Sequence, residues 1–475
     1  MPHERQIYLL DPQSIDPETI AVAFAKTSRS PQSFRKIAAE LTAERSAEFH
    51  DKWVVGYGHA SVAEHAVLHV AMENVSRLAV ETIESSRLAS YTEKSTRYQK
   101  WAPDEFTTPP EIERDAPPAL KELYQTTCRE LFEAYLETLP AVRNDIEREH
   151  PREADESDGA WERRIRSEYV DVCRFLLPAA ALANLGMTIN ARALEHSLRK
   201  MLSHPLEEVR QVGAEIKAVA MESVPTLLKY VDRVAYLEET SAELEQIAAQ
   251  VRAEREPEDW CNLVCCSNEG ENSVLAAALY RFGEFSYAQA LGRVTTLPAQ
   301  ERAGLARALL GRLGKHDIPL RETEHAAYTF DVLVDQGGYF ELKRHRMMTQ
   351  TAQPLTTRLG YATPKRMVSA GMGEVYQQAM AKAAAAYEAL AAFNAHAASY
   401  VVPNGYNRRV LLGMNLRSAR HFVTLRAADN AHFSIRRLAL RVAEEIQRAT
   451  PLLGKYLHVP TQQTWQEIEA EYFYG

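Results

Sequence analysis

A run of basic side chains near residue 345 can bind an anion. Arg344, His345 and Arg346 follow Lys343 directly and place potentially cationic donors in a row. Arginine forks match phosphate and carboxylate groups, so this run predicts a pocket for an anionic ligand. A solvated basic turn is the alternative, and it would be the better interpretation if the motif occurred alone.

A second polar segment, Glu93–Tyr98, lies in the first half of the chain. It offers a carboxylate, two hydroxyls, a guanidinium and a phenol within six residues. Such a loop can bind a sugar phosphate and a base edge together. The alternative is an ordinary polar turn after Tyr91, and this segment is a weak signal by itself.

Two Asn-x-Arg segments precede helical patterns. They are Asn190–Arg192 and Asn415–Arg417, and Arg426 lies eleven residues after Asn415. Asparagine is a good N-cap, so capping of the helices is the alternative to ligand binding. For Arg426 the alternative is an exposed helical arginine.

Metal and thiol chemistry are disfavoured. His65 and His69 follow His59, but on a strand residues four apart lie about 13 Å from each other, too far for one ion. Cys261, Cys265 and Cys266 lack the paired CxxC spacing of a zinc site, which favours buried apolar cysteines. No cysteine lies in the polar loops described above, which argues against a thiolate nucleophile. The chain also has no GxGxxG, P-loop or GxSxG motif.

The elements that carry these residues occur twice in the same order. Each half has a Glu-His pair, then an alternating apolar run, then a basic or polar segment. His325 lies 260 residues after His65, and Arg346 lies 259 residues after Arg87. The agreement of the two offsets predicts two copies of one ancestral unit.

A second pair of blocks supports the repeat. Residues 175–196 parallel residues 400–421, and Asn415 lies 225 residues after Asn190. The first half therefore carries an insertion, and the highly charged residues 143–164 fit it as a solvated helix or loop.

Period-two alternation predicts half-buried strands after each Glu-His pair, at Leu68–Met72 and at Tyr328–Val334. Helical patterns cover the remaining long segments. They are residues 206–224, 237–258, 381–398 and 435–450.

Composition limits the class of protein. The 475 residues are 46% hydrophobic and 25% charged, with 55 Lys and Arg against 64 Asp and Glu. This acidic balance argues against a generic nucleic-acid binder but allows a local basic pocket. We expect a cytoplasmic, reduced protein, because five cysteines make no disulfide framework and neither a signal peptide nor a membrane span is readable.

At these residues the chain resembles the flavin-dependent thymidylate synthase family. That family carries GHxxxxEH, a strand, RHRxxSxNExSxRY, an NxR segment and a downstream Leu-Arg. The chain resembles two fused copies, over most of residues 15–235 and 270–460. The resemblance implies an α+β fold for each copy, a β-sheet covered by helices, with pseudo-twofold symmetry between copies at 1–240 and 241–475 and a linker at 237–270.

The two copies depart from the family pattern in complementary ways. The first keeps residues 58–65 as GHASVAEH, together with Ser90 and the whole ExSxRY loop at residues 93–98. It has Ser85-Ser86-Arg87 for RHR and Thr92 for Asn. Eleven residues after Asn190 it has Met201, although Arg199 and Lys200 are close. The second copy keeps Glu324-His325, RHR, Asn415, Arg417 and Arg426, but residues 351–357 replace the loop.

The resemblance implies roles for matching residues. Arg426 would be catalytic, polarising the uracil ring. The dUMP-binding residues would be Glu93, Ser95, Thr96, Arg97, Arg174 and Arg344. The FAD-binding residues would be Ser61, Arg87, Asn190, Arg192, Arg344, His345, Arg346, Asn415, Arg417 and His421.

The implied reaction reduces FAD with NADPH and moves the methylene of methylenetetrahydrofolate to dUMP, giving dTMP. No metal, nucleic acid or membrane partner is implied. Intact sites would combine the first copy's loop with the second copy's RHR and Leu-Arg, and a homodimer would mimic the family's homotetramer. Two alternatives stay open, namely a flavoenzyme for another pyrimidine or one-carbon acceptor, and a non-catalytic paralogue that binds flavin or nucleotide.

Overall fold

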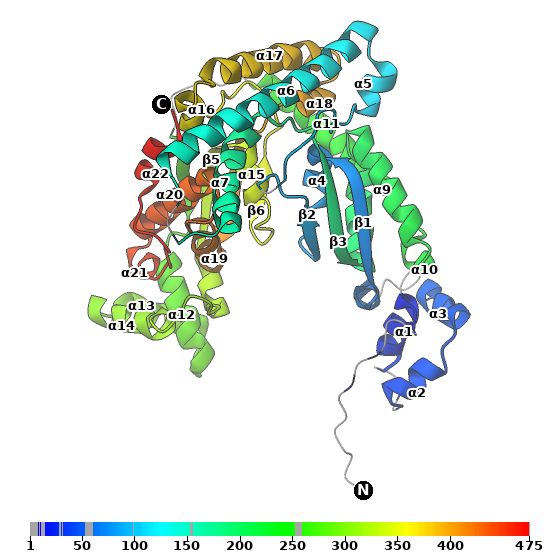
Figure 1. The fold of residues 1–475 in the computed structure, drawn as a ribbon. Helices are drawn as coiled ribbons and strands as arrows, with labels where there is room; N and C mark the ends of the chain where they lie inside the picture. The colour runs from blue at the N-terminus through cyan, green and yellow to red at the C-terminus, as the bar shows by residue number, and fades with distance from the viewer. Residues whose placement is uncertain are drawn as a thin grey trace. The chain divides into compact units, whose positions relative to one another are not determined.

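The computed structural model describes residues 8, 10, 15–27, 30, 32–52, 60–97, 99–152, 155–251 and 259–474. Helices and two small antiparallel sheets make up two compact units (Figure 1). Unit 1 is Met1–Lys94, Thr107–Ala116 and Ala181–Glu254. Unit 2 is Ser95–Phe106, Pro117–Ala180 and Arg255–Gly475. The expected division into copies at 1–240 and 241–475 stays a prediction.

Unit 1 is built on a sheet with the strand order β1-β3-β2. The strands are β1 (Val67–Ser76), β2 (Ala89–Glu93) and β3 (Leu182–Asn190), and both pairings are antiparallel. The predicted strand at 68–72 is thus confirmed, with Leu68 and Met72 buried. Helices α4 (Arg77–Ile83), α8 (Ala191–Leu202) and α9 (Glu207–Ala220) pack with this sheet and with one another.

The helix predicted over 206–224 ends early, at Ala220, and Pro225 begins a separate short helix. The helix predicted over 237–258 is present as Ala235–Gln250, while residues 252–258 lie outside the described residues. The further helices of unit 1 are α1 (Pro17–Thr27), α2 (Phe34–Ala39), α3 (Ala43–Phe49), η2 (Ala60–His65), α5 (Pro110–Asp115), α10 (Pro225–Leu228) and α11 (Ala235–Gln250).

Unit 2 has a four-stranded antiparallel sheet in the order β4-β5-β7-β6. The strands are β4 (Cys261–Cys266), β5 (Ala327–Asp335), β6 (Thr349–Ala352) and β7 (Asn407–Asn415). The strand predicted at 328–334 is confirmed, with Tyr328, Phe330, Val332 and Val334 buried. Helix α20 (Phe433–Ala449), predicted at 435–450, packs on β4 and β5.

The registers of the two sheets match at the offsets of the sequence repeat. Val67 faces Asn190 in unit 1, and Ala327 faces Asn415 in unit 2. Ser90 faces Thr188 in unit 1, and Thr349 faces Gly413 in unit 2. Ala327 lies 260 residues after Val67, and Thr349 lies 259 residues after Ser90. Their partners on β3 and β7 are 225 residues apart in both cases, so the offsets are those of the sequence repeat.

Long helices complete unit 2. Helix α6 (Pro118–Glu149) runs beside α17 (Gly373–Ala391) at the top of Figure 1. The single helix expected over 381–398 is interrupted after Ala391, and α18 (Ala395–Ala398) restarts with Asn394 as its N-cap. The remaining helices are α7 (Asp158–Cys173), η3 (Arg174–Leu176), α12 (Gly270–Phe282), α13 (Tyr287–Thr296), α14 (Ala299–Leu310), η4 (Arg321–His325), α15 (Gln336–Leu342), α16 (Lys365–Ser369), η5 (Ser399–Val401), α19 (Leu416–Arg426), α21 (Pro451–Gly454) and α22 (Trp465–Tyr472).

One expectation about the cysteines is wrong. Cys261 is buried, but Cys265 is exposed and Cys266 is only half-buried. Strand β4 lies at the edge of its sheet, and its register shifts between Leu263 and Cys265, so the last residues of the strand lack cover. The charged residues 143–164 form the end of α6, a connection and the start of α7. Among the described residues, no helix is both long and apolar enough to cross a membrane.

Candidate functional site

Four arginines from distant parts of the sequence gather in unit 2. Arg97 lies in the polar loop after β2, and Arg174 begins η3. Arg344 follows α15, and Arg426 ends α19. Every one of them contributes to the electrostatic environment of the buried Glu341 carboxylate, which therefore marks the centre of the group. We call Arg97, Arg174, Arg344 and Arg426 the arginine cluster.

Arg97 is fixed by a carboxylate on α7. Its Nε lies 2.9 and 3.1 Å from the two Asp171 carboxylate oxygens, and its Nη2 donates at 2.7 Å. Its Nη1 donates to the Asn430 backbone oxygen at 3.0 Å. Such a bidentate pair fixes the plane of the guanidinium as well as its position. Ser95 accepts a hydrogen bond from the Arg97 backbone N–H at 3.2 Å, which shapes the loop.

Arg174 is fully buried yet incompletely paired. Its Nη1 donates to Thr96 Oγ1 at 3.0 Å and lies 4.0 Å from Glu341 Oε1. Among the described residues, Nε and Nη2 of Arg174 find no hydrogen-bond acceptor. Burial lowers the pKa of this guanidinium, opposed by Asp171 and Glu341. Unsatisfied buried donors on a cation are costly, so the site is suited to an added oxyanion.

Arg426 is held from two sides. Its Nη1 donates to Glu341 Oε2 at 2.7 Å, and its Nε donates to His345 Nε2 at 2.9 Å. The imidazole must therefore present a lone pair at Nε2 and carry its proton on Nδ1. Burial, together with Arg426 and His421, lowers the pKa of His345 to about 3, so the ring is neutral at ordinary pH.

Glu341 is a carboxylate surrounded by cations. Burial alone would raise its pKa, but Arg344, Arg174, Arg426 and Arg97 together lower the pKa of Glu341 to about 2. Its side chain is only 8% exposed. Glu341 therefore remains ionised and balances part of the positive charge of the arginine cluster.

Small residues at the start of α15 set the position of Glu341 and His345. Asp335 caps this helix by accepting a hydrogen bond from the Gly338 backbone N–H at 2.8 Å. A Cβ on Gly338 would lie 2.8 Å from Val334 Cγ2 and 3.2 Å from Ser434 Cβ. Glycine thus allows α15 to approach β5 and α20 closely, and the helix then points its last turn at the arginine cluster.

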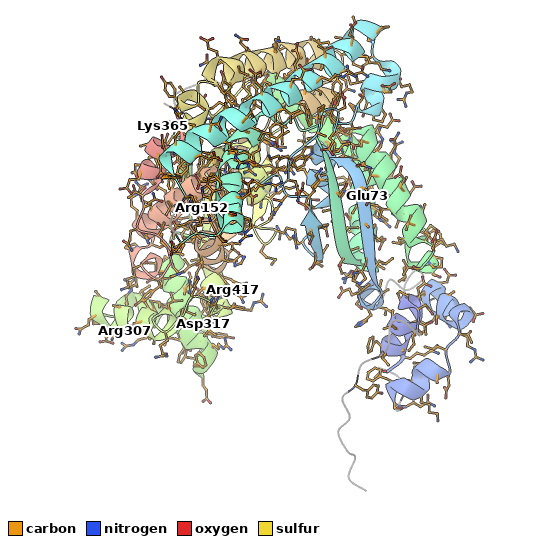
Figure 2. The ribbon with its side chains drawn as sticks, viewed as in Figure 1. Glu73, Arg152, Arg307, Asp317, Lys365 and Arg417 are labelled. Atoms are coloured by element: carbon orange, nitrogen blue, oxygen red, sulfur yellow. The ribbon has the colours of Figure 1, made fainter. Side chains whose placement is uncertain are left out.

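The two Asn-x-Arg segments have the same local geometry. Asn190 caps α8, accepting from the Ala193 backbone N–H at 2.8 Å, and Asn415 caps α19, accepting from the Ser418 backbone N–H at 2.9 Å. Capping, the structural alternative, is therefore confirmed at both positions. Each following arginine pairs with the glutamate of a Glu-His pair: Arg192 with Glu64, and Arg417 with Glu324 at 2.5 Å (Figure 2 labels Arg417).

The structure divides the predicted ligand-binding residues between the units. Ser95, Thr96, Arg97, Arg174, Arg344, His345, Arg346, Asn415, Arg417, His421 and Arg426 belong to unit 2, whereas Ser61, Arg87, Glu93, Asn190 and Arg192 belong to unit 1. Glu93 forms a buried ion pair with Arg77, at 2.8 Å. Ser61 and Arg87 are exposed. The motif residues Gly58, His59 and Tyr98 lie outside the described residues.

Sequence reasoning missed two acidic residues of the site, Glu341 and Asp171. Each lies three residues before an arginine of the cluster, Arg344 or Arg174, so it falls one helical turn away. That spacing was the available signal. It could not show which distant arginine each carboxylate binds, because those partners are 85 and 74 residues away.

Unit 2 also presents donors at its surface that suit an anionic ligand. His421 and Arg344 are exposed and Arg346 is half-buried, so their cationic or polar groups are accessible to a diphosphate. A cavity of about 530 Å³ lies at η4 and α12 and includes Glu324, the partner of Arg417. Arg281, Arg321, Tyr280 and His325 supply further polar groups to its wall.

Comparisons with known proteins identify the relatives of this chain. The family model described as thymidylate synthase complementing protein matches residues 10–226 and 262–452. A UPF0159 protein of Chlamydia muridarum is 31% identical over 434 residues, which are 88% of this chain and 82% of that protein. A UPF0159 protein of Thermoplasma acidophilum is 28% identical over 451 residues, covering 86% of this chain and 88% of that protein.

A shorter relative matches only part of the chain. The flavin-dependent thymidylate synthase of Clostridium tetani is 26% identical over 216 residues, which are 45% of this chain and 82% of that protein. The family match spans most of both halves, including the segments that build the arginine cluster. This chain therefore belongs to the thymidylate synthase complementing protein family.

Proposed function

We propose that this protein is a flavin-dependent thymidylate synthase that converts dUMP to dTMP, with methylenetetrahydrofolate as carbon donor and NADPH as reductant. One observation carries the proposal: Arg97 and Arg174, from the first half, share a cluster with Arg344 and Arg426, from the second half. The family relationship and the similarity to the Clostridium tetani flavin-dependent thymidylate synthase support the same reaction class.

The charge of the site suits a phosphate monoester. The four guanidinium groups of the arginine cluster outnumber the three carboxyl groups that act on them, Glu341, Asp171 and Asp335, so the site keeps a net positive charge. A phosphate monoester carries close to two negative charges near neutral pH. Arg174, with its unsatisfied buried Nε and Nη2, would bind phosphate oxygens, and Ser95, Thr96, Arg97 and Arg344 complete the proposed dUMP set within unit 2. Glu93, predicted together with them, belongs to unit 1 and is paired with Arg77 there.

Arg426 is the proposed catalytic residue. Glu341 and His345 orient its guanidinium through Nη1 and Nε, respectively. A fixed guanidinium beside the pyrimidine would polarise a ring carbonyl and stabilise the negative charge that develops when N3 loses its proton. Because the group is oriented before substrate binds, little reorganisation is needed during the reaction.

FAD, when bound, would supply the redox chemistry. In unit 2, Arg344, Arg346, Arg417 and His421 would bind its charged groups, with Asn415 holding the start of α19 in place. His345 would act at this site through Arg426, since its Nε2 is already used by that arginine. Ser61, Arg87, Asn190 and Arg192 would form the corresponding, degenerate site of the first copy.

A product assay tests the proposal. Purified protein would be mixed anaerobically with FAD, NADPH, methylenetetrahydrofolate and dUMP, and dTMP would be measured by mass spectrometry. We expect dTMP formation to fall by about 10²-fold or more in Arg97→Lys and Arg426→Lys. Arg358→Lys is the matched control, because Arg358 forms an exposed ion pair with Glu388 at 2.8 Å, outside the arginine cluster.

Other results would identify a different function. Bound flavin and NADPH oxidation without dTMP would indicate another pyrimidine or one-carbon acceptor. Absence of both dTMP and bound flavin would indicate a non-catalytic relative. Full activity in Arg97→Lys and Arg426→Lys would contradict the composite site even if dTMP were formed.

A further inference from the structure

Glu341 lies outside the motif residues that the sequence singles out, three residues before the Arg-His-Arg run. Its Oε2 accepts a hydrogen bond from Arg426 at 2.7 Å, and its Oε1 lies 4.0 Å from Arg174 Nη1. Asp171 is bound by the Nε and Nη2 of Arg97, and Asp335, the N-cap of α15, acts on Arg174 through its charge. Glu341 is thus the carboxylate that links the two arginines with different proposed tasks.

We propose that Glu341 is a positioning residue that holds Arg426 for the pyrimidine and also serves as the internal counter-ion of the arginine cluster, lowering its affinity for a dianion. This inference rests on the proposed function for the identity of the nucleotide. Its counter-ion role depends only on the charges and distances in unit 2.

The geometry separates the two roles. The contact of Oε2 with Arg426 is a short charge-assisted hydrogen bond, which orients the guanidinium. Oε1 lies beside Arg174 at a distance beyond a hydrogen bond, so it acts there through its charge. A phosphate that reached the unsatisfied Nε and Nη2 of Arg174 would meet the negative charge of Glu341 nearby.

Glu341→Gln should therefore separate binding from turnover. The amide keeps an oxygen that accepts from Arg426 Nη1 but removes the negative charge, so a dianion should bind roughly tenfold more tightly. Turnover should fall, because a neutral amide holds a guanidinium more weakly than a carboxylate does. Glu341→Ala should also bind a dianion more tightly and should lower kcat further, by about 10²-fold. A purely structural role would weaken binding and turnover together.

The test uses flavin-loaded full-length protein and two probes, dUMP and inorganic phosphate. Calorimetry gives their dissociation constants, and dTMP formation gives kcat and KM. Glu388→Gln is the matched control, because it makes the same substitution in an exposed Arg–Glu pair. Glu341→Asp keeps the negative charge on a shorter side chain, and it takes the place of Glu341→Gln if the glutamine variant does not fold. Glu341→Asp should retain the wild-type phosphate affinity and lose turnover.

The outcomes are distinguishable. Tighter phosphate binding in Glu341→Gln supports the counter-ion role whether or not dUMP is the substrate. Unchanged phosphate affinity in Glu341→Gln overturns that role, and so does a changed affinity in Glu341→Asp. Unchanged kcat in Glu341→Ala overturns the positioning role. Failure of the wild type to bind dUMP, with phosphate still bound, would instead overturn the proposed function.

Discussion

His345 shows how one buried side chain connects the site to the stability of the fold. Its ring lies edge-on to Phe422, with centroids 5.0 Å apart, and its Nε2 accepts from Arg426. Burial and the neighbouring cation lower the pKa of His345 to about 3. The folded protein therefore keeps this ring neutral under conditions in which an unfolded chain would protonate it.

We expect the free energy of unfolding to rise with pH between about 3 and 6.5. In that interval the unfolded state binds a proton at His345 that the folded state does not, so acid destabilises the fold. Glu341 adds an effect of the same sign between its folded pKa of about 2 and its unfolded value near 4.3. Denaturant unfolding of wild type and His345→Gln, measured between pH 5 and 7, tests this expectation.

His345→Gln should show a shallower pH dependence, because the glutamine does not titrate while its oxygen can still accept from Arg426 Nε. His316→Gln changes an exposed histidine and should retain the wild-type slope. Equal slopes in His345→Gln and wild type would show that the imidazole titrates in the folded protein much as it does when unfolded.

Arg174 predicts a conflict between stability and binding. Its buried Nε and Nη2 find no acceptor among the described residues, so Arg174→Met should raise the free energy of unfolding of the ligand-free protein by about 1–3 kcal/mol. The same variant should lose the increase in Tm that dUMP or phosphate gives the wild type. Thermal scans with and without ligand measure both effects, and Arg358→Met controls for removal of an exposed arginine.

Loss of stability in Arg174→Met, by contrast, would mean that the contacts of Nη1 with Thr96 and Glu341 outweigh the desolvation of the guanidinium.

At the scale of elements, the entry to α15 leaves little room for a side chain at Gly338. Gly338→Ala should lower the free energy of unfolding by about 1–3 kcal/mol, because its Cβ would press on Val334 and Ser434. It should also reduce turnover, since α15 carries Glu341 and leads to His345. Gly292→Ala in α13 is the matched control: a Cβ there meets nothing within 4 Å, so it should stabilise by up to about 1 kcal/mol.

Denaturant unfolding and the dTMP assay measure these two variants side by side. A Gly338→Ala protein as stable as wild type would show that α15 can shift away from β5 without cost.

Period-two patterns were enough to predict β1 and β5, because each strand has one buried face and its alternating residues report that face. The ends of helices were harder to predict. The break after Ala391 depends on the Asn394 cap, which lies within a region of high helix propensity. The exposure of Cys265 was missed because an edge position is a property of the sheet, which local sequence does not encode.

The site residues, like the elements, were predicted only in part. Residue types and spacing identified Arg97, Arg344 and Arg426, whereas the family resemblance was needed for Arg174 and for any substrate. The carboxylates that orient these arginines were missed, since an acidic residue one turn from an arginine is common on helices and its real partner is set by tertiary contact.

At the scale of the whole molecule, the two units keep the same local scaffold and differ in their polar residues. Both have the same strand register at the repeat offsets, an Asn cap before the second repeated helix and a Glu–Arg ion pair beside it. The Arg-His-Arg run is present only in the second half of the sequence. Matching local geometry with unequal motifs predicts unequal binding.

Arg192→Ala and Arg417→Ala test that inequality as a matched pair. Each removes the arginine of an Asn-x-Arg segment and the partner of a Glu-His glutamate, Glu64 or Glu324. If only the second-half set binds flavin, Arg417→Ala should lose most of its bound FAD while Arg192→Ala keeps the wild-type content, near one FAD per chain. Absorbance of purified protein after titration with FAD, referenced to protein concentration, gives this ratio. The opposite result would be two FAD per chain in the wild type, with equal losses in both variants. Both copies would then bind flavin. In that case the presence of Ser85-Ser86-Arg87 in place of Arg-His-Arg would have altered the chemistry of the first site without removing its cofactor.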